Sequence, residues 1–203
     1  MKTLLLARHA YSIGNAEDVV NGVPPGPGLS AQGVEEAQEL GRRLAVEQID
    51  LGVSSRLRRA SETLVAALAG RDVPRLTEPL FDEIGFGAFE GCPLAEYRVW
   101  ARSEPPDAEC PGGGETRAAA AARIASALSS LLRRPEQVIL VVSHGLPVRY
   151  ALDASDGRFP EQKLAPVPHA VAHRLERPEV ERAAETLAGW AAHPVFGNAP
   201  IGG

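Results

Sequence analysis

Cysteine is scarce in this sequence of 203 residues, which contains only Cys92 and Cys110. Neither belongs to a C-x-x-C pair or lies beside a residue that could complete a metal site, so we expect no bound metal. One disulfide between them remains compatible with the spacing. Because 44% of the residues are hydrophobic, a chain of this length buries about 70% of its unfolded surface and needs no such covalent support.

Long hydrophobic runs and an excess of positive charge are missing as well. The apolar run at residues 3–7 is too short for a signal peptide or a membrane span, and Arg8 ends it. The net charge of -5 argues against nucleic acid binding through the overall field of the protein. We therefore expect a cytoplasmic protein without nucleic acid or membrane partners, and the sequence leaves a homodimer open.

The patterns that are present alternate between strands and helices. Apolar runs predict strands at residues 3–7, 49–53 and 138–142. The last run has no polar alternation, which is typical of a parallel strand covered on both faces. Less regular apolar patterns predict an extended segment at residues 75–81 and a strand at residues 167–175.

Apolar residues at three-to-four spacing predict the helices between these strands. They occur at residues 31–48, 57–68, 115–134 and 179–190, with one further helix that begins near Pro147. This alternation predicts an α/β fold. We expect a single domain over residues 1–195 and a flexible glycine- and proline-containing tail at residues 196–203.

Basic side chains directly follow three of the predicted strands. Arg8 and His9 end the first, Arg56 follows the second, and His144 follows the last. Because the carboxyl ends of parallel strands meet at one edge of a sheet, beside helix N-termini, we expect these side chains to lie together. Two guanidinium forks suit the several oxygens of a phosphate group better than a carboxylate. The sequence therefore predicts a phosphate site.

A histidine at a phosphate site also supplies a nucleophile. Neutral imidazole attacks phosphorus, and phosphoryl transfer otherwise needs charge stabilisation and in-line positioning. We therefore expect His9 to accept the phosphoryl group. Glu83 lies beside apolar Ile84 and Phe86, and such surroundings raise the pKa of a carboxyl group, so Glu83 is the expected acid that protonates the departing alcohol.

Residues 8–15 read Arg-His-Ala-Tyr-Ser-Ile-Gly-Asn. They resemble the signature of the histidine phosphatase superfamily, Arg-His-Gly followed by Thr or Ser and then Asn, although Ala10 stands where the family has Gly. Four more matches follow in the family's order: Leu29-Ser30-x-x-Gly33, Ser54-x-Arg56-Leu57-x-Arg59-Ala60-x-x-Thr63, Gly113-Gly114-Glu115-Thr116 and Val142-Ser143-His144-Gly145. The family's Glu-x-x-x-Gly-x-x-Glu-Gly pattern selects Glu83 rather than Asp82.

This resemblance implies a phosphoglycerate mutase-like fold, a three-layer sandwich with a mostly parallel central sheet and helices on both faces. It implies that His9 is the phosphorylated nucleophile and Glu83 the proton donor. The residues implied to bind the phosphoryl group are Arg8, Asn15, Arg56, His144 and Gly145. Neither a metal nor another cofactor is implied.

Residues 84–114 form an irregular excursion that we expect to determine the substrate. A short helix at residues 95–101 carries Tyr97 and Trp100, which either line a pocket or pack in the core. The only cations of the excursion are Arg98 and Arg102, against the acidic Glu90, Glu96, Glu104, Asp107 and Glu109. We expect this balance to hold a second anionic group poorly.

The sequence leaves three functions open. The first is a phosphomonoesterase acting on a small phosphorylated metabolite, which the acidic excursion favours. The second is a cofactor-dependent phosphoglycerate mutase-type transferase, and the third is a catalytically weak module that binds a phospho-ligand or a protein, which only Ala10 supports.

Other basic residues are assigned simpler roles. We expect the arginine pairs at residues 42–43, 58–59 and 133–134 to be solvated, with Arg58 or Arg59 near the entrance of the cleft. His169 and His173 lie in a strand pattern, where a separation of four residues is about 13 Å, too far to share a metal ion. His169 is a weaker candidate for the pocket.

Overall fold

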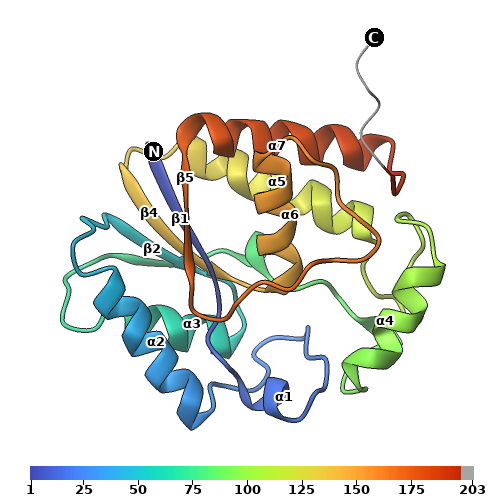
Figure 1. Ribbon diagram of the computed structural model, residues 1–203, viewed down its shortest axis with the longest axis horizontal. Coiled ribbons are helices and arrows are strands. Elements are labelled where there is room, and N and C mark those ends of the chain that lie inside the picture. The colour runs from blue at the N-terminus through green and yellow to red at the C-terminus, as the bar shows by residue number, and fades with distance from the viewer. Residues whose placement is uncertain (198–203) are drawn as a thin grey trace.

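A five-stranded sheet in the order β3-β2-β4-β1-β5 forms the centre of the computed structural model, which describes residues 1–197 (Figure 1). The strands are β1 (Thr3–Arg8), β2 (Leu51–Ser54), β3 (Arg75–Thr77), β4 (Val138–Ser143) and β5 (Ala172–Glu176). The first four are parallel, and β5 pairs antiparallel with β1. The register pairs Arg8 with Ser143 and Ser54 with Val142, so β1, β2 and β4 end at one edge.

Helices cover both faces of this sheet (Figure 1). One layer contains α2 (Ala31–Arg43) and α3 (Arg58–Ala67), and the other contains α5 (Arg117–Leu132), α6 (Gly145–Ser155) and α7 (Arg177–Ala192). In β1, Leu5 and Ala7 pack in the core on the side of α2 and α3, whereas Leu4 and Leu6 pack in the core on the side of α5, α6 and α7. Because both faces are buried, the strand is apolar throughout. The predicted α/β three-layer sandwich is confirmed.

Several predicted boundaries differ from the observed ones. The strand expected at residues 167–175 begins only at Ala172, because the backbone turns at Ala170 with a φ of 50°. The extended segment expected at residues 75–81 is a strand only to Thr77, and a 3₁₀ turn follows at Pro79–Phe81. The helix expected to reach residue 48 ends at Arg43.

The segments between these elements gather near the carboxyl edge of the sheet. They contain α1 (Ile13–Ala16), a 3₁₀ turn at Gly87–Phe89 and α4 (Leu94–Ser103). Tyr97 of α4 packs edge-on against Phe86, with 4.8 Å between ring centroids. Cys92 and Cys110 are both free thiols.

The C-terminal part departs from the expected tail. Phe196 packs on Trp190, with 5.9 Å between ring centroids, so it belongs to the packed body of the protein. The rest of the predicted tail, residues 198–203, lies outside the described residues. Within residues 1–197, none of the helices combines the length and the apolar character that crossing a bilayer requires.

Candidate active site

His9 follows β1 and is 3% exposed. Its Nδ1 lies 2.8 Å from the carbonyl oxygen of Ala10. A carbonyl oxygen only accepts hydrogen bonds, so Nδ1 carries the proton and the lone pair is on Nε2. Burial and the neighbouring charges of His144, Arg59 and Arg8 hold the pKa of His9 well below its usual value of 6.5. The imidazole is therefore neutral, with Nε2 ready to act as a nucleophile.

Arg59 occupies the place beside His9 that the sequence analysis gave to Arg56. Its Nε donates to Nε2 of His9 across 3.1 Å, and one terminal nitrogen donates to the carbonyl of Asn21 across 2.8 Å. Arg59 is 5% exposed, so the expectation that it is solvated is wrong. A signal was present, because Arg59 lies one turn before Thr63 and next to Ala60, both fully buried in α3.

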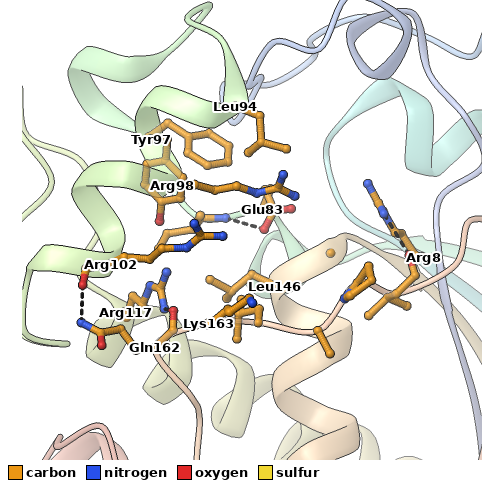
Figure 2. A pocket seen from close by; sticks show the side chains of 17 residues that line it. Arg8, Glu83, Leu94, Tyr97, Arg98, Arg102, Arg117, Leu146, Gln162 and Lys163 are labelled. Atoms are coloured by element: carbon orange, nitrogen blue, oxygen red, sulfur yellow. Dashed lines mark hydrogen bonds between the residues drawn. The ribbon is translucent and has the colours of Figure 1, made fainter.

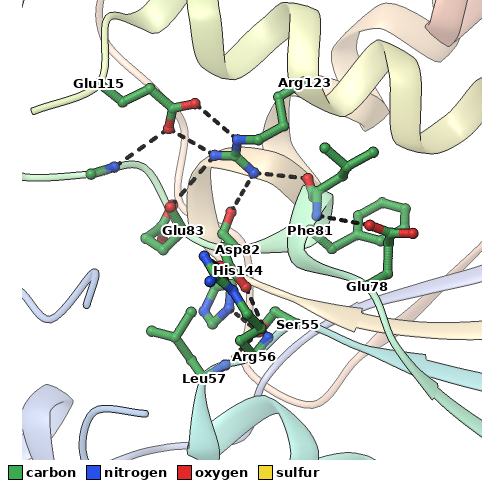
Figure 3. A network of polar contacts seen from close by, with 12 residues as sticks. Ser55, Arg56, Leu57, Glu78, Phe81, Asp82, Glu83, Glu115, Arg123 and His144 are labelled. Carbon is green, nitrogen blue, oxygen red and sulfur yellow. Dashed lines mark hydrogen bonds and ion pairs between the residues drawn. The ribbon is translucent and has the colours of Figure 1, made fainter. Parts of the chain in front are cut away.

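The structure does not bring Arg56 into this group. Its guanidinium forms an ion pair with Asp82, with 2.6 Å between the closest nitrogen and oxygen, and its side chain is 53% exposed. Arg56 lies between β2 and α3 as expected, but the chain turns there and its side chain points to the Asp82 loop (Figure 3). Strand-end position alone does not decide which way a long side chain points.

Arg8 and His144 also lie close to His9. The His9 and His144 rings are 5.1 Å apart between centroids, and Nε2 of His144 is 2.7 Å from Oγ of Ser55. Arg8 donates to the carbonyl of Val167 across 2.9 Å. Burial and the charges of Arg59, Arg8 and Arg123 lower the pKa of His144 well below 6.5.

Three buried nitrogens of these side chains have no hydrogen-bond partner within residues 1–197. They are Nε of Arg8, Nη1 of Arg59 and Nδ1 of His144. A buried polar group left unpaired costs about 1–3 kcal/mol, so a cluster of three is expected where a ligand completes the contacts. All three can act as hydrogen-bond donors, which suits an anion.

A cavity of about 70 Å³ lies against His9, and its wall contains four of the other candidates: Arg8, Asn15, Arg59 and Glu83. Asn15 is fixed at the start of α1, where its Oδ1 accepts hydrogen bonds from the backbone N–H and the hydroxyl of Ser12. Gly145 begins α6 and lines the neighbouring cavity instead. Arg56 lines neither cavity, and neither does His144.

Glu83 and Asp82 have different surroundings (Figure 3). Asp82 is 5% exposed, and its carboxylate is bound by Arg56. Glu83 lines both cavities, and its Oε1 accepts a hydrogen bond from the N–H of Ile84 across 3.0 Å. Burial raises the pKa of Glu83 above 4.5, although Arg59, Arg8 and Arg123 act in the opposite direction. Of the two carboxyl groups, only Glu83 is free to exchange a proton with a ligand.

Arg123 of α5 holds this loop in place. It donates to the carbonyls of Leu80 and Asp82 across 2.8 and 3.0 Å, and Glu115 binds it through two contacts of 2.8 Å. The Gly-Gly-Glu-Thr turn therefore supplies the anchor of Arg123, and Thr116 caps α5. This role of Arg123 could not be predicted from the sequence, because only the fold brings residues 80–83 next to α5.

The Ala10 position accepts alanine without strain. Its backbone is not among the positive-φ residues, and its N–H donates to Oγ1 of Thr63 across 3.0 Å. His169 lies close by, since its Nδ1 is 2.8 Å from the carbonyl oxygen of His9. Within residues 1–197, no group of three or more metal-binding side chains gathers closely enough to hold an ion.

A second cavity of about 170 Å³ opens on the other side of Glu83 (Figure 2). The two cavities share Arg8, Glu83, Phe86 and Leu94. The larger one is lined by Arg98 and Arg102 of the excursion, joined by Arg117 and Lys163. Of the acidic residues in the excursion, none that the structure describes lines it. The acidic charge total expected for residues 84–114 therefore did not indicate which side chains line this cavity, because the charge total of a segment does not tell which side chains face inward.

Comparison with known proteins gives a consistent family. The sequence profile of the histidine phosphatase superfamily (branch 1) matches residues 4–190. A 2,3-bisphosphoglycerate-dependent phosphoglycerate mutase of Brucella anthropi is 29% identical over 182 residues, which cover 80% of this chain and 85% of the mutase.

Solved structures resemble this fold as well. A putative alpha-ribazole-5'-P phosphatase of Escherichia coli superposes with a TM-score of 0.71 and 25% identity, covering 86% of this chain and 95% of that one. A mycobacterial glucosyl-3-phosphoglycerate phosphatase, solved with VO3, gives a TM-score of 0.74 over 86% of this chain and 92% of that one. Its identity of 24% supports the fold alone.

Proposed function

Since the chain belongs to the histidine phosphatase superfamily, branch 1, we propose that it is a phosphomonoesterase that hydrolyses a small phosphorylated metabolite through a phosphohistidine on His9. The observation that carries this proposal is the neutral His9 beside a cavity lined by two arginines and a carboxyl group of raised pKa; its Nε2 lone pair accepts a hydrogen bond from Arg59, which the phosphoryl group displaces. Phosphoryl transfer needs these parts and little else.

In the first step the phosphoryl group lies in the small cavity, bound by Arg8, Arg59 and the side chain of Asn15. Nε2 of His9 forms a bond to phosphorus while the bond from phosphorus to the alcohol oxygen breaks. Glu83 gives its proton to that oxygen, so a neutral alcohol leaves and Glu83 becomes a carboxylate.

In the second step water attacks the phosphorus of the phosphohistidine. The Glu83 carboxylate takes a proton from the water, the bond from phosphorus to nitrogen breaks, and inorganic phosphate leaves. This restores neutral His9 and protonated Glu83. Arg8 and Arg59 stabilise the charge on the phosphoryl oxygens in both steps. His144, whose ring centroid lies 5.1 Å from that of His9, adds a donor from Nδ1 when the Ser55 hydroxyl donates to its Nε2.

The test compares wild type with His9→Ala on an aryl phosphate without added metal. Loss of the nucleophile lowers kcat by several orders of magnitude, whereas His193→Ala, an exposed histidine at the end of α7, leaves it unchanged. When the wild-type reaction is quenched without acid, the intact mass of the protein is expected to show one added phosphoryl group. The His9→Ala protein is expected to lack this added mass. Equal activity of wild type and His9→Ala would refute the proposal.

A mutase-type reaction is the second candidate, and the cationic lining of the larger cavity favours it. A mutase retains the first product and returns the phosphoryl group to another of its oxygens. Incubation with phosphoglycerates, with and without a bisphosphoglycerate primer, separates the two reactions. Release of inorganic phosphate indicates hydrolysis, and formation of an isomer without phosphate release indicates the mutase.

A further inference from the structure

The carbonyl oxygen of His9 is bound by a side chain and not by the backbone of the sheet. His9 is 3% exposed, and no backbone N–H of residues 1–197 donates to this oxygen. Its partner is Nδ1 of His169, which lies 2.8 Å away. Because a carbonyl oxygen only accepts hydrogen bonds, Nδ1 of His169 carries the proton. A histidine distant in the sequence therefore holds the peptide unit of the nucleophile.

The end of β5 explains why a side chain takes this position. The antiparallel pairing of β5 with β1 stops at the pair Ala172 and Ala7, beside which β1 continues toward His9 (Figure 1). At Ala170 the backbone turns with a φ of 50°, a left-handed conformation that residues with a Cβ disfavour. Beyond this turn the strand no longer offers an N–H to His9, and the side chain of His169 supplies the donor instead.

The segment that carries His169 also holds Arg8. The N–H of Ala170 donates to the carbonyl oxygen of Arg8 across 3.1 Å. The carbonyl oxygen of Val167 accepts a hydrogen bond from the Arg8 guanidinium across 2.9 Å. Residues 167–170 therefore fix the backbone and the guanidinium of Arg8 together with the backbone of His9.

The ring of His169 packs between two other rings of the site. Its centroid lies 5.4 Å from that of His9 and 5.4 Å from that of Tyr11, both in edge-on arrangements. Burial and the charge of Arg8 lower the pKa of His169 below 6.5, so the ring adds no positive charge beside His9 at neutral pH. His169 lines neither the small nor the larger cavity. Its effect on a ligand must therefore pass through the residues that it contacts.

The position of the His9 ring decides how Nε2 meets phosphorus. The backbone that carries this ring is bound by His169, and Nδ1 of the ring is bound by the carbonyl oxygen of Ala10. A displacement of about 1 Å lowers the rate of a reaction that depends on positioning about 10²-fold. A fixed backbone at His9 is therefore worth much more to the reaction than to packing.

We infer that His169 is a positioning residue, which fixes the backbone of His9 so that Nε2 attacks phosphorus in line with the bond to the departing oxygen. This inference rests on the proposed function, because it assumes that His9 is the nucleophile. It assigns His169 no contact with the substrate.

Two replacements of His169 separate its hydrogen bond from its bulk. His169→Phe keeps a planar ring but has no donor. In His169→Asn the amide nitrogen is bonded to Cγ, as Nδ1 of histidine is, so it donates from the same place. On an aryl phosphate, His169→Phe is expected to lower kcat/KM about 10- to 100-fold. His169→Asn is expected to return it to within about 5-fold of wild type, because the hydrogen bond is restored.

Binding and folding are measured beside the rate. The inhibition constant of inorganic phosphate is expected to stay within about 3-fold of wild type in both variants, because the arginines that bind phosphate are unchanged. Urea unfolding gives the folded fraction of each variant, so a loss of stability is not counted as a loss of rate. His173→Phe is the matched control, since His173 is a second half-buried histidine in β5 that lines neither cavity. It is expected to keep kcat/KM.

NMR of protein labelled with nitrogen-15 in histidine tests the inference without turnover. Above the pKa of His169, wild type is expected to show its ring proton on Nδ1. The nitrogen frequency of Nε2 of His9 depends on the hydrogen bond from Arg59, so a displaced ring changes it. This frequency is expected to change in His169→Phe and to return toward the wild-type value in His169→Asn.

Three results would overturn the inference: a ring proton on Nε2 of His169, an unchanged kcat/KM in His169→Phe, or an equal loss in His169→Phe and His169→Asn. Equal activity of His9→Ala and wild type refutes the proposed function instead. In that case the NMR signals of His169 and His9 still decide whether His169 positions the His9 ring.

Discussion

Nε of Arg59 donates a hydrogen bond to Nε2 of His9 across 3.1 Å, and both side chains are buried. This contact aims a permanent cation at the nitrogen that carries the lone pair. Burial lowers the pKa of Arg59 to about 10, so it stays protonated at neutral pH. The same contact helps to keep His9 neutral, because a second positive charge at that distance is unfavourable.

Arg59→Gln is therefore expected to lower kcat/KM about 10³-fold, as loss of other phosphate-binding arginines does. Arg56→Gln is expected to change kcat/KM less than about 5-fold and to lower the free energy of unfolding by about 1–2 kcal/mol, because the Asp82 carboxylate loses a half-exposed partner. Steady-state kinetics and urea unfolding of both variants check this pair. The reverse ranking of activities would return the phosphate role to Arg56.

Glu83→Gln is expected to lower kcat by about 10²–10⁴-fold on an alkyl phosphate, since the departing alkoxide needs the proton. On p-nitrophenyl phosphate the loss in the first step is much smaller, because nitrophenolate leaves without protonation. Glu185→Gln serves as the control, since it makes the same replacement at an exposed position of α7. A loss of equal size on both substrates would contradict a proton-donor role.

The pH profile of kcat/KM is expected to be bell-shaped. His9 reacts when neutral, so activity increases as the pH rises through its pKa, which lies well below 6.5. Glu83 reacts when protonated, so activity decreases as the pH rises through its pKa, which lies above 4.5. Glu83→Gln is expected to remove the descending limb and to keep the ascending one. A descending limb of unchanged position in that variant argues against the assignment.

Gly33→Ala is expected to destabilise the protein by about 3 kcal/mol and to reduce activity. A Cβ at this position lies 1.9 Å from the carbonyl oxygen of Tyr11, so α2 must move away from the loop that follows His9. Gly189→Ala is the matched control, because a Cβ there meets nothing within 4 Å, and alanine stabilises a helix interior by about 0.5–1 kcal/mol. Chemical unfolding of both variants measures the difference, and a stability of Gly33→Ala equal to wild type would contradict the predicted clash.

The amino-acid sequence determined the layers of this protein and much of its site. Strands that are apolar throughout, such as Val138–Ser143, must be covered on both faces, and parallel strands must end at a common edge. Arg8, His9 and His144 lie at the ends of such strands, so the position of each at this edge depends only on where its own strand ends. The alternation of apolar runs and turn-forming residues in the sequence marks those ends.

Only the tertiary structure showed that Arg59 contacts His9 whereas Arg56 contacts Asp82, and it alone showed that Arg98, Arg102, Arg117 and Lys163 line one cavity. Long charged side chains have several low-energy directions, and the partner that selects one comes from a distant part of the chain, as Asp82 does for Arg56. A sum of charges over residues 84–114 could not reveal a cationic cavity, because two of its four outer cations belong to other segments. The sequence sets which side chains reach the edge of the sheet, whereas packing between distant segments sets which of them face the ligand.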